Sequence, residues 1–189
     1  MNGAWSVQEQ KSFFRKELRK KLAGLGPPER TRRSQEILRK LLSHPKFLAA
    51  EKFFTYIALE CEVQTRPIVE EGRRRGKRVY VPRVEPAKKR IAMMEIIDWK
   101  ELKPGAFGIL EPAFDPKRLG RPEDLGLAVV PGLGFDRRGG RLGRGEGYFD
   151  RFLAEAKKAY KVGLAFEFQI VDEVPREAKD VSVDEVIIG

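Results

Sequence analysis

The residue types that could do chemistry are concentrated in one glycine-rich stretch, residues 129–153. Seven of the chain's 18 glycines lie between Gly132 and Gly147. Backbone without Cβ atoms can turn its N–H groups toward one point, and a helix that follows adds the positive end of its dipole. Arg141 and Arg144 strengthen this interpretation, because guanidinium groups grip phosphate oxygens. The stretch therefore predicts a strand–loop–helix site for phosphate or carboxylate.

The spacing of these glycines excludes two common phosphate-binding motifs. No Gly-Lys-Ser/Thr follows, as a Walker A loop requires, and Gly143-Arg-Gly-Glu-Gly147 lacks the spacing of a dinucleotide fingerprint. A flexible surface hairpin is the alternative interpretation. Asp150 falls in the first turn of the helix that follows, where a carboxylate is favoured in any case, so capping is its alternative role.

Other types of site lack the residues they need. The sole histidine, His44, and the sole cysteine, Cys61, exclude zinc sites built on Cys/His clusters. A Ser-His-Asp triad would have to use His44, which lies in a Ser-His-Pro turn, and we do not expect one. A single cysteine fits a reducing compartment. No secretory signal is evident, and no apolar run approaches the ~20 residues of a membrane span, so we expect a cytoplasmic protein with no membrane partner.

The positive charge is unevenly distributed. Of the net charge of +10, +8 belongs to residues 1–50, which carry 12 basic and 4 acidic side chains. Such a field attracts polyanions, including nucleic acid or a nucleotide triphosphate. The alternative is a pair of helices with solvated basic faces. No nucleic-acid module is recognisable, nor is a basic stretch interleaved with stacking aromatics, so nucleic acid is not the expected partner.

Periodicity predicts an alternation of helices and strands. Helices are expected over 7–23, 29–43, 65–76 and 148–159, and strands over 52–59, 78–84, 161–168 and 183–188. Residues 91–97 fit either a strand or a short helix, 103–124 are irregular, and 125–135 form a buried strand that runs into the glycine loop. This order predicts one α/β domain over residues 1–189, with three α/β/α layers and a largely parallel sheet whose ligands gather at the carboxyl ends of the strands.

Longer motifs carry a resemblance to a known family. The runs Pro131-Gly-Leu-Gly-Phe-Asp136 and Gly140-Arg-Leu-Gly-Arg-Gly-Glu-Gly-Tyr-Phe-Asp150 resemble the signature of 5-formyltetrahydrofolate cyclo-ligases, also called methenyltetrahydrofolate synthetases. Further pieces resemble the basic helix, second motif and C-terminal signature of that family: Lys11-Ser-Phe-Phe-Arg15, Glu62-Val-Gln-Thr65 with Gly76-Lys-Arg-Val-Tyr-Val-Pro-Arg83, and Val183-Asp-Glu-Val186. The similarity spans nearly the whole chain, in the family's order.

The resemblance implies an ATP- and Mg²⁺-dependent ligase. Members of the family convert 5-formyltetrahydrofolate to 5,10-methenyltetrahydrofolate and hydrolyse ATP to ADP and phosphate. A formamide oxygen is a poor leaving group, so the γ-phosphoryl group is transferred to it before N10 attacks and phosphate departs. Such a transfer depends mainly on positioning and charge neutralisation. The expected partners are therefore small molecules, and we expect a monomer.

The resemblance also implies the roles of individual residues. Catalytic roles fall to Arg141, Arg144 and Asp150. The residues expected to bind ATP are Lys11, Arg15, Arg141, Gly143, Gly145, Gly147 and Phe149. Those expected to bind the folate are Ile57, Glu62, Arg144, Gly145, Glu146, Gly147 and Tyr148. Those expected to bind Mg²⁺ are Asp150 and Asp184.

Two positions depart from the family pattern. Phe149 stands where the family usually has tyrosine, and Glu146 stands where relatives often have a basic residue or glycine. Without the resemblance, Glu62 would be interpreted as a solvated turn residue, Asp184 as an exposed charge beside an edge strand, and Lys11 as a solvated surface charge. Two other functions stay open: a basic polyanion-binding module without catalysis, and an ATP-dependent relative that acts on another substrate.

Overall fold

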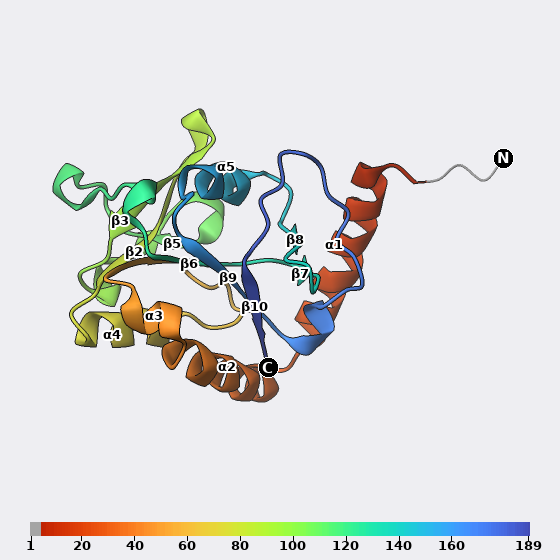
Figure 1. The fold of residues 1–189 in the computed structure, drawn as a ribbon, viewed down its shortest axis with the longest axis horizontal. Coiled ribbons are helices and arrows are strands. Elements are labelled where there is room, and N and C mark those ends of the chain that lie inside the picture. Colours follow the sequence, from red (N-terminus) through yellow and green to blue (C-terminus); the bar gives the residue numbers. More distant parts are fainter. Residues whose placement is uncertain (1–4) are drawn as a thin grey trace.

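The computed structural model describes residues 5–189, and a six-stranded sheet forms its centre (Figure 1). The strand order is β10-β9-β6-β1-β2-β3, and all neighbours are parallel except β3, which runs antiparallel to β2. The strands are β1 (Lys52–Thr55), β2 (Arg78–Glu85), β3 (Arg90–Glu95), β6 (Leu127–Val130), β9 (Tyr160–Ala165) and β10 (Glu185–Ile188).

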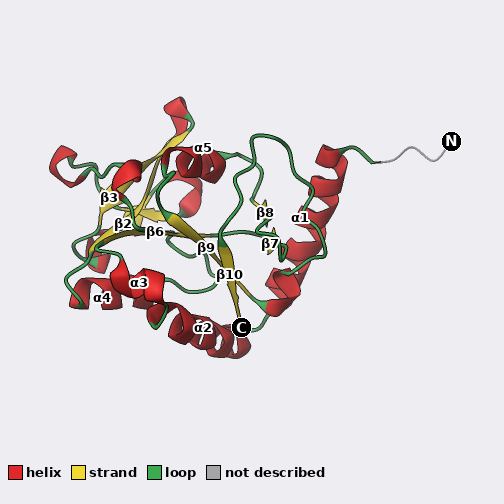
Figure 2. Cartoon of the chain, in the orientation of Figure 1, coloured by secondary structure: helices red, strands yellow, loops and turns green. Residues whose placement is uncertain are grey.

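Helices cover both faces of this sheet, as Figures 1 and 2 show. One face carries α2 (Pro27–Leu42), α3 (Pro45–Ala49) and α4 (Arg66–Arg74), and the other carries α5 (Tyr148–Glu155). The first helix, α1 (Val7–Gly24), lies beside a hairpin formed by β7 (Gly134–Phe135) and β8 (Arg141–Leu142). The predicted three-layer α/β/α fold with a largely parallel sheet is confirmed.

The remaining elements are short. A second hairpin pairs β4 (Lys103–Pro104) with β5 (Leu110–Glu111). Turns of 3₁₀ helix occupy several loops: Pro86–Lys88, Trp99–Glu101, Ala106–Gly108, Pro116–Arg118, Pro122–Asp124 and Glu167–Gln169. Three of them lie between residues 103 and 124, the part of the chain for which the sequence predicts irregular structure.

Alternate residues of the central strands pack on opposite faces. Phe53 belongs to the core that α2 and α4 cover, whereas Phe54 packs against Phe152 of α5 with ring centroids 4.3 Å apart. Strands buried on both faces read as nearly continuous apolar runs. For this reason the sequence identifies them clearly.

The ends of several elements differ from the sequence prediction. The strand expected over 52–59 ends at Thr55, and residues 56–59 continue beyond the carboxyl edge of the sheet. The helix expected over 148–159 ends at Glu155. Helix α2 begins at Pro27 rather than residue 29, because proline suits the first helical positions.

Local pairing and capping explain the other differences. The undecided segment 91–97 is a strand, β3, that pairs with β2. The short helix α3 was not expected: His44 caps it by accepting the N–H of Lys46, so Pro45 begins a helix as well as ending one. The stretch expected to be a glycine loop contains the β7–β8 hairpin, and this hairpin is buried, unlike the flexible surface hairpin considered as the alternative.

Candidate active site

The glycine-rich segment leaves the carboxyl end of β6, forms the β7–β8 hairpin and returns to the sheet through α5. Gly145 and Gly147 have φ values of +122° and +68°, which residues with a side chain rarely adopt. Gly147 is the N-cap of α5 and provides no capping side chain. The first N–H groups of this helix are therefore open to an acceptor from outside the helix.

Arg141 lies inside this segment with its side chain only 2% exposed. Its Nη2 donates to Asp150 Oδ1 at 2.6 Å, and its Nη1 donates to the carbonyl oxygen of Pro131 at 3.3 Å. Among residues 5–189, Nε of Arg141 has no hydrogen-bond partner. A buried donor without a partner costs about 1–3 kcal/mol, so this nitrogen favours an additional acceptor.

Two arginines of α1 reach the same segment. Nε of Arg15 donates to the carbonyl oxygen of Gly143 at 3.0 Å, and Nη2 of Arg19 donates to that of Arg144 at 3.1 Å. Burial lowers the pKa of Arg15, and the neighbouring charge of Arg19 lowers it further, whereas nearby carboxylates such as Asp180 act in the opposite direction. Arg15 is therefore a partly desolvated cation held against the glycine backbone.

Lys11, one helical turn before Arg15, is 4% exposed and forms ion pairs with two carboxylates. Its Nζ lies 3.0 Å from Glu177 Oε2 and also donates to Asp180 Oδ2. The hydrogen bond from Lys11, followed by one from Gln8, lowers the pKa of Glu177. The solvated surface charge considered for Lys11 is thus wrong for this structure.

Glu62 connects the chain beyond β1 to the glycine segment. Its Oε1 pairs with Arg144 Nη2 at 2.7 Å, and its Oε2 accepts the N–H of Leu59 at 2.9 Å. Burial opposes the charge of Arg144, but the carboxylate of Glu62 outweighs it and raises the pKa of the guanidinium. The Glu62 side chain is 11% exposed, so it is not the solvated turn residue considered as the alternative.

The carboxyl ends of β1 and β6 meet because these strands are parallel neighbours. This topology places Ile57, which is 4% exposed, near the glycine segment. Tyr148, the first residue of α5, packs edge-on against Phe107 with ring centroids 5.8 Å apart. Phe107 is 65% exposed and adopts a φ of +57°, so it projects from its loop with a strained backbone.

The two departures from the family pattern occupy different environments. Phe149 packs edge-on against Phe54 at 6.2 Å, and the guanidinium of Arg141 lies 5.9 Å from its ring centroid. Phenylalanine therefore keeps the ring contact that this position offers. Glu146 is exposed, and its carbonyl oxygen accepts a hydrogen bond from Arg151 at 2.9 Å.

Asp150 and Asp184 have different partners and different environments. Asp150 is in the first turn of α5, where its Oδ1 accepts from Arg141 and from the N–H of Val181 at 3.2 Å. Asp184 directly precedes β10, and its Oδ2 accepts the N–H of Lys161 at 2.7 Å near the amino end of β9. The structure brings Asp150 to the arginines but leaves Asp184 exposed beside the edge strand.

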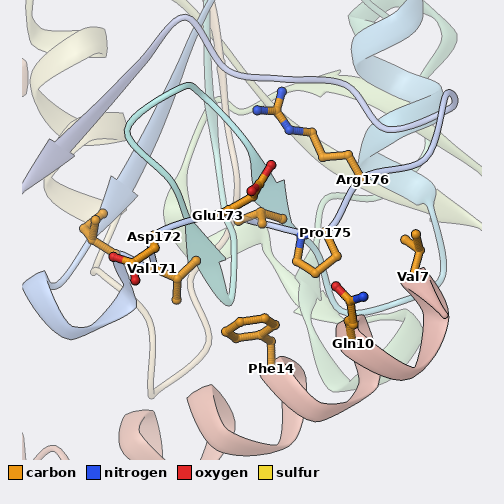
Figure 3. A pocket seen from close by; sticks show the side chains of 10 residues that line it. Val7, Gln10, Phe14, Val171, Asp172, Glu173, Pro175 and Arg176 are labelled. Atoms are coloured by element: carbon orange, nitrogen blue, oxygen red, sulfur yellow. The ribbon is translucent and has the colours of Figure 1, made fainter. Parts of the chain in front are cut away.

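A groove of about 700 Å³ runs between α1 and residues 170–176. Figure 3 shows Gln10 and Phe14 of α1 facing Val171 and Pro175 across it. Arg176, which also lines the groove, directly precedes Glu177, the partner of Lys11. The groove thus opens next to the buried Lys11 ion pairs.

Several residues that hold the site together were not predicted from the sequence. Asp136, fully buried, accepts N–H groups of Arg138, Gly140 and Val174 at 2.8–2.9 Å and joins the hairpin turn to the wall of the groove. The side chain of Gln169 donates to carbonyl oxygens at the start of the glycine segment. Asp136 lies within the recognised motif, but no spacing rule predicts what it contacts.

No helix within residues 5–189 combines the length and apolar character that crossing a membrane requires. Within the same residues, no three or more His, Cys, Asp or Glu side chains are grouped so that they could hold a metal ion.

Known proteins resemble this chain in both sequence and fold. A family model described as the 5-formyltetrahydrofolate cyclo-ligase family matches residues 7–189. The 5-formyltetrahydrofolate cyclo-ligase of Mus musculus is 30% identical, with 97% of this chain and 96% of the relative covered. The mitochondrial 5-formyltetrahydrofolate cyclo-ligase of Arabidopsis thaliana is 31% identical over 96% of this chain and 75% of the relative.

Solved structures agree with the sequence matches. The 5,10-methenyltetrahydrofolate synthetase of Aquifex aeolicus superposes with a TM-score of 0.83 and 36% identity, and the match covers 94% of this chain and 89% of that one. A synthetase of the same name from Mycoplasma pneumoniae, at 24% identity and a TM-score of 0.74, shares the fold over 94% of this chain and 97% of its own. The chain is therefore an enzyme that belongs to the 5-formyltetrahydrofolate cyclo-ligase family.

Proposed function

We propose that this enzyme converts 5-formyltetrahydrofolate to 5,10-methenyltetrahydrofolate with hydrolysis of ATP. The family and its relatives are named for the cyclo-ligase reaction, and the Aquifex aeolicus relative is named for its product. The observation that carries the proposal is the convergence of Lys11, Arg15 and Arg141 around the glycine segment, next to the Glu62–Arg144 pair. In this arrangement, cations that could bind a triphosphate lie next to a carboxylate, Glu62, that could bind a pterin.

The chemistry requires activation of the formyl oxygen. Transfer of the γ-phosphoryl group of ATP to this oxygen forms a C–O–P linkage and releases ADP. N10 then attacks the formyl carbon, the C–O bond breaks, and inorganic phosphate leaves with the oxygen. Because phosphoryl transfer depends on positioning and on neutralising charge, the protein's main tasks are to orient two ligands and to supply cations.

The phosphate chain would lie against the glycine segment. Nε of Arg141 is buried and has no partner within the part of the chain that the structure describes, and the amino end of α5 supplies backbone N–H groups that favour an anion. Lys11 and Arg15 approach from α1. In this assignment Phe149 packs against the nucleotide, and Gly143, Gly145 and Gly147 let the backbone come close to the phosphates.

The folate would lie between the end of β1 and the same segment. A carboxylate can accept from adjacent N–H groups of the pterin, and a charge-assisted hydrogen bond contributes about 1.5–3 kcal/mol, so we assign this contact to Glu62. Arg144 fixes the Glu62 carboxylate. Ile57 and Tyr148 provide the ring contacts, while Gly145, Glu146 and Gly147 contribute backbone.

Asp150 suits Mg²⁺ better than Asp184 does. Mg²⁺ prefers one or two carboxylates together with phosphate oxygens and water. Both hydrogen bonds that Asp150 receives end on Oδ1, which leaves Oδ2 without a donor from residues 5–189. Bound with ATP, the ion would neutralise phosphate charge. Asp184 faces the Lys161 amide, so a role as second ligand would require its carboxylate to leave that partner.

One assay separates this proposal from its two alternatives. With 5-formyltetrahydrofolate and Mg-ATP, the enzyme should produce the methenyl chromophore and inorganic phosphate in equal amounts. Phosphate release with a different folate, and none with this one, would indicate a relative with another substrate. If neither product forms, and nucleic acid binds with a steep salt dependence, the protein is a polyanion-binding module.

A monomeric state and a cytoplasmic location stay predictions from the sequence. Analytical ultracentrifugation of the full chain tests the first, and a single species at 21.6 kDa is expected. Fractionation of the source cells tests the second.

A further inference from the structure

Lys11 is an unusual cation for a phosphate site because its charge is already compensated. Its side chain is 6% exposed, and its Nζ contacts both Glu177 and Asp180. Around the glycine segment the three cations Lys11, Arg15 and Arg141 face three carboxylates: Glu177, Asp180 and Asp150. The formal charge of these six groups is zero, and the one further cation beside them, Lys179 at 3.6 Å from Glu177, is exposed and screened by solvent. A phosphate chain therefore meets a neutral arrangement unless one carboxylate moves away.

The two partners of Lys11 are held differently. Asp180 is 15% exposed, its Oδ2 also accepts the N–H of Glu177 at 2.8 Å, and the next residue, Val181, donates to Asp150. The Glu177 side chain is 29% exposed, and its other partners are both exposed: the Gln8 amide at 2.7 Å and the Lys179 ammonium at 3.6 Å. Asp180 is thus anchored by backbone, whereas Glu177 can swing into solvent and leave the Lys11 ammonium in place.

We propose that Glu177 is a resident counter-ion of Lys11 that the nucleotide phosphates displace, and that it thereby sets the affinity for nucleotide. Asp180 stays bound and positions the ammonium. This inference rests on the proposed function, because it takes Lys11 to be a phosphate contact. The proposal predicts the direction of the change in affinity. Removing the charge of Glu177 strengthens nucleotide binding, because the phosphate chain no longer competes with a carboxylate.

The test measures the Kd of ADP by calorimetric titration of the full chain. Glu177→Gln keeps the shape of the side chain and should lower Kd about fivefold, which corresponds to about 1 kcal/mol. Glu173→Gln is the matched control: it removes an equal charge from the same segment, but Glu173 pairs with Arg138 at 2.8 Å and not with Lys11. Its Kd should stay within about twofold of the parent, since exposed charges are screened.

Combining Glu177→Gln with Lys11→Met distinguishes the phosphate role of Lys11 from the counter-ion role of Glu177. Lys11→Met alone should raise Kd, and adding Glu177→Gln to it should have no further effect. If Lys11→Met leaves Kd unchanged, the phosphate role of Lys11 in the proposed function fails. If Lys11→Met weakens binding but Glu177→Gln does not strengthen it, or Glu173→Gln strengthens it equally, the counter-ion role is overturned.

Folding is checked by thermal melting of each variant. If Glu177→Gln is too unstable to titrate, Gln8→Ala offers a second route, because it removes the hydrogen bond from Gln8 to Glu177 without touching Lys11. Loss of this partner should ease the displacement and lower Kd, and an unchanged or higher Kd would contradict the proposal.

Discussion

The buried carboxylate of Asp136 gives the sharpest test of how the site is held. Its Oδ1 accepts N–H groups of Arg138 and Gly140, and its Oδ2 accepts that of Val174. These bonds close the turn directly before Arg141 and tie it to the wall of the groove. The perturbation is Asp136→Asn, which changes the volume little but turns one acceptor oxygen into an NH₂ donor.

The expected loss follows from these contacts. Asparagine can keep its oxygen toward Arg138 and Gly140, so its amide nitrogen then faces the N–H of Val174. An unsatisfied buried polar group costs about 1–3 kcal/mol, and here two donors oppose each other. We expect the free energy of unfolding at pH 7 to fall by about 3 kcal/mol.

The pH dependence carries a further signature. Burial alone would raise the pKa of Asp136, but the backbone N–H donors, Val174 first, outweigh it and lower the pKa below its ordinary value. A carboxyl with a lowered folded-state pKa stabilises the protein above its unfolded pKa of about 3.9 and loses this contribution as the pH falls through the lower folded value. The difference in the free energy of unfolding between the parent and Asp136→Asn should therefore become smaller as the pH falls through that acid range.

Urea unfolding followed by circular dichroism, at pH 7 and at several values below 4, measures both effects. Asp98→Asn is the matched control, because Asp98 is an exposed cap with one backbone partner, Lys100 N–H at 2.9 Å. Asp98→Asn should lower the free energy of unfolding by less than about 1 kcal/mol. This role of Asp136 is refuted if Asp136→Asn lowers the free energy of unfolding no more than Asp98→Asn does. It is also refuted if the difference between the parent and Asp136→Asn does not change with pH.

Two further predictions concern the glycine segment and its ion pair. Gly139→Ala should lower the free energy of unfolding by about 2–3 kcal/mol, because φ at Gly139 is +81° and the new Cβ would overlap the carbonyl oxygen of Val183. The control is Gly24→Ala, which has open space around it and should be neutral or slightly stabilising in the same urea experiment. Arg144→Met and Glu62→Gln should each raise the KM for 5-formyltetrahydrofolate, and a double-mutant cycle should give a coupling of about 0.5–1 kcal/mol; additive effects would mean that the pair does not act as a unit.

The sequence predicted the layers of the fold because burial leaves a strong signal in it. Strands such as β6 are apolar throughout, since helices cover both faces, and α1 carries a capping box of Ser6 and Glu9. The ends of elements were less predictable. Thr55 ends β1 although the apolar run continues. The pairing with β2 stops at Phe54 and the pairing with β6 stops at Thr55, and local composition does not encode where pairing stops.

The candidate site also has a part that the sequence predicts and a part that only the fold shows. Arg141 and the glycines are close in sequence, so a motif predicts them together. The partners of Lys11 lie 166 and 169 residues away, and only the folded chain brings them to α1. Asp150 and Asp184 show the converse, since these carboxylates of two recognised motifs contact different partners, Arg141 in one case and the Lys161 amide in the other. Motifs identify residues, but tertiary contacts decide which of them meet.

The buried ion pairs also bear on the choice between an enzyme and a general polyanion-binding surface. Binding of nucleic acid draws on exposed cations that release counter-ions, and residues 1–50 hold most of the net charge. Yet Lys11 is 6% exposed and paired, and Nε of Arg15 is bound to the carbonyl oxygen of Gly143. Cations neutralised by their own protein attract a long polyanion weakly, because its phosphates cannot reach them from the surface. A compact ligand that enters the site and displaces a carboxylate can reach them, which favours a nucleotide over a nucleic acid.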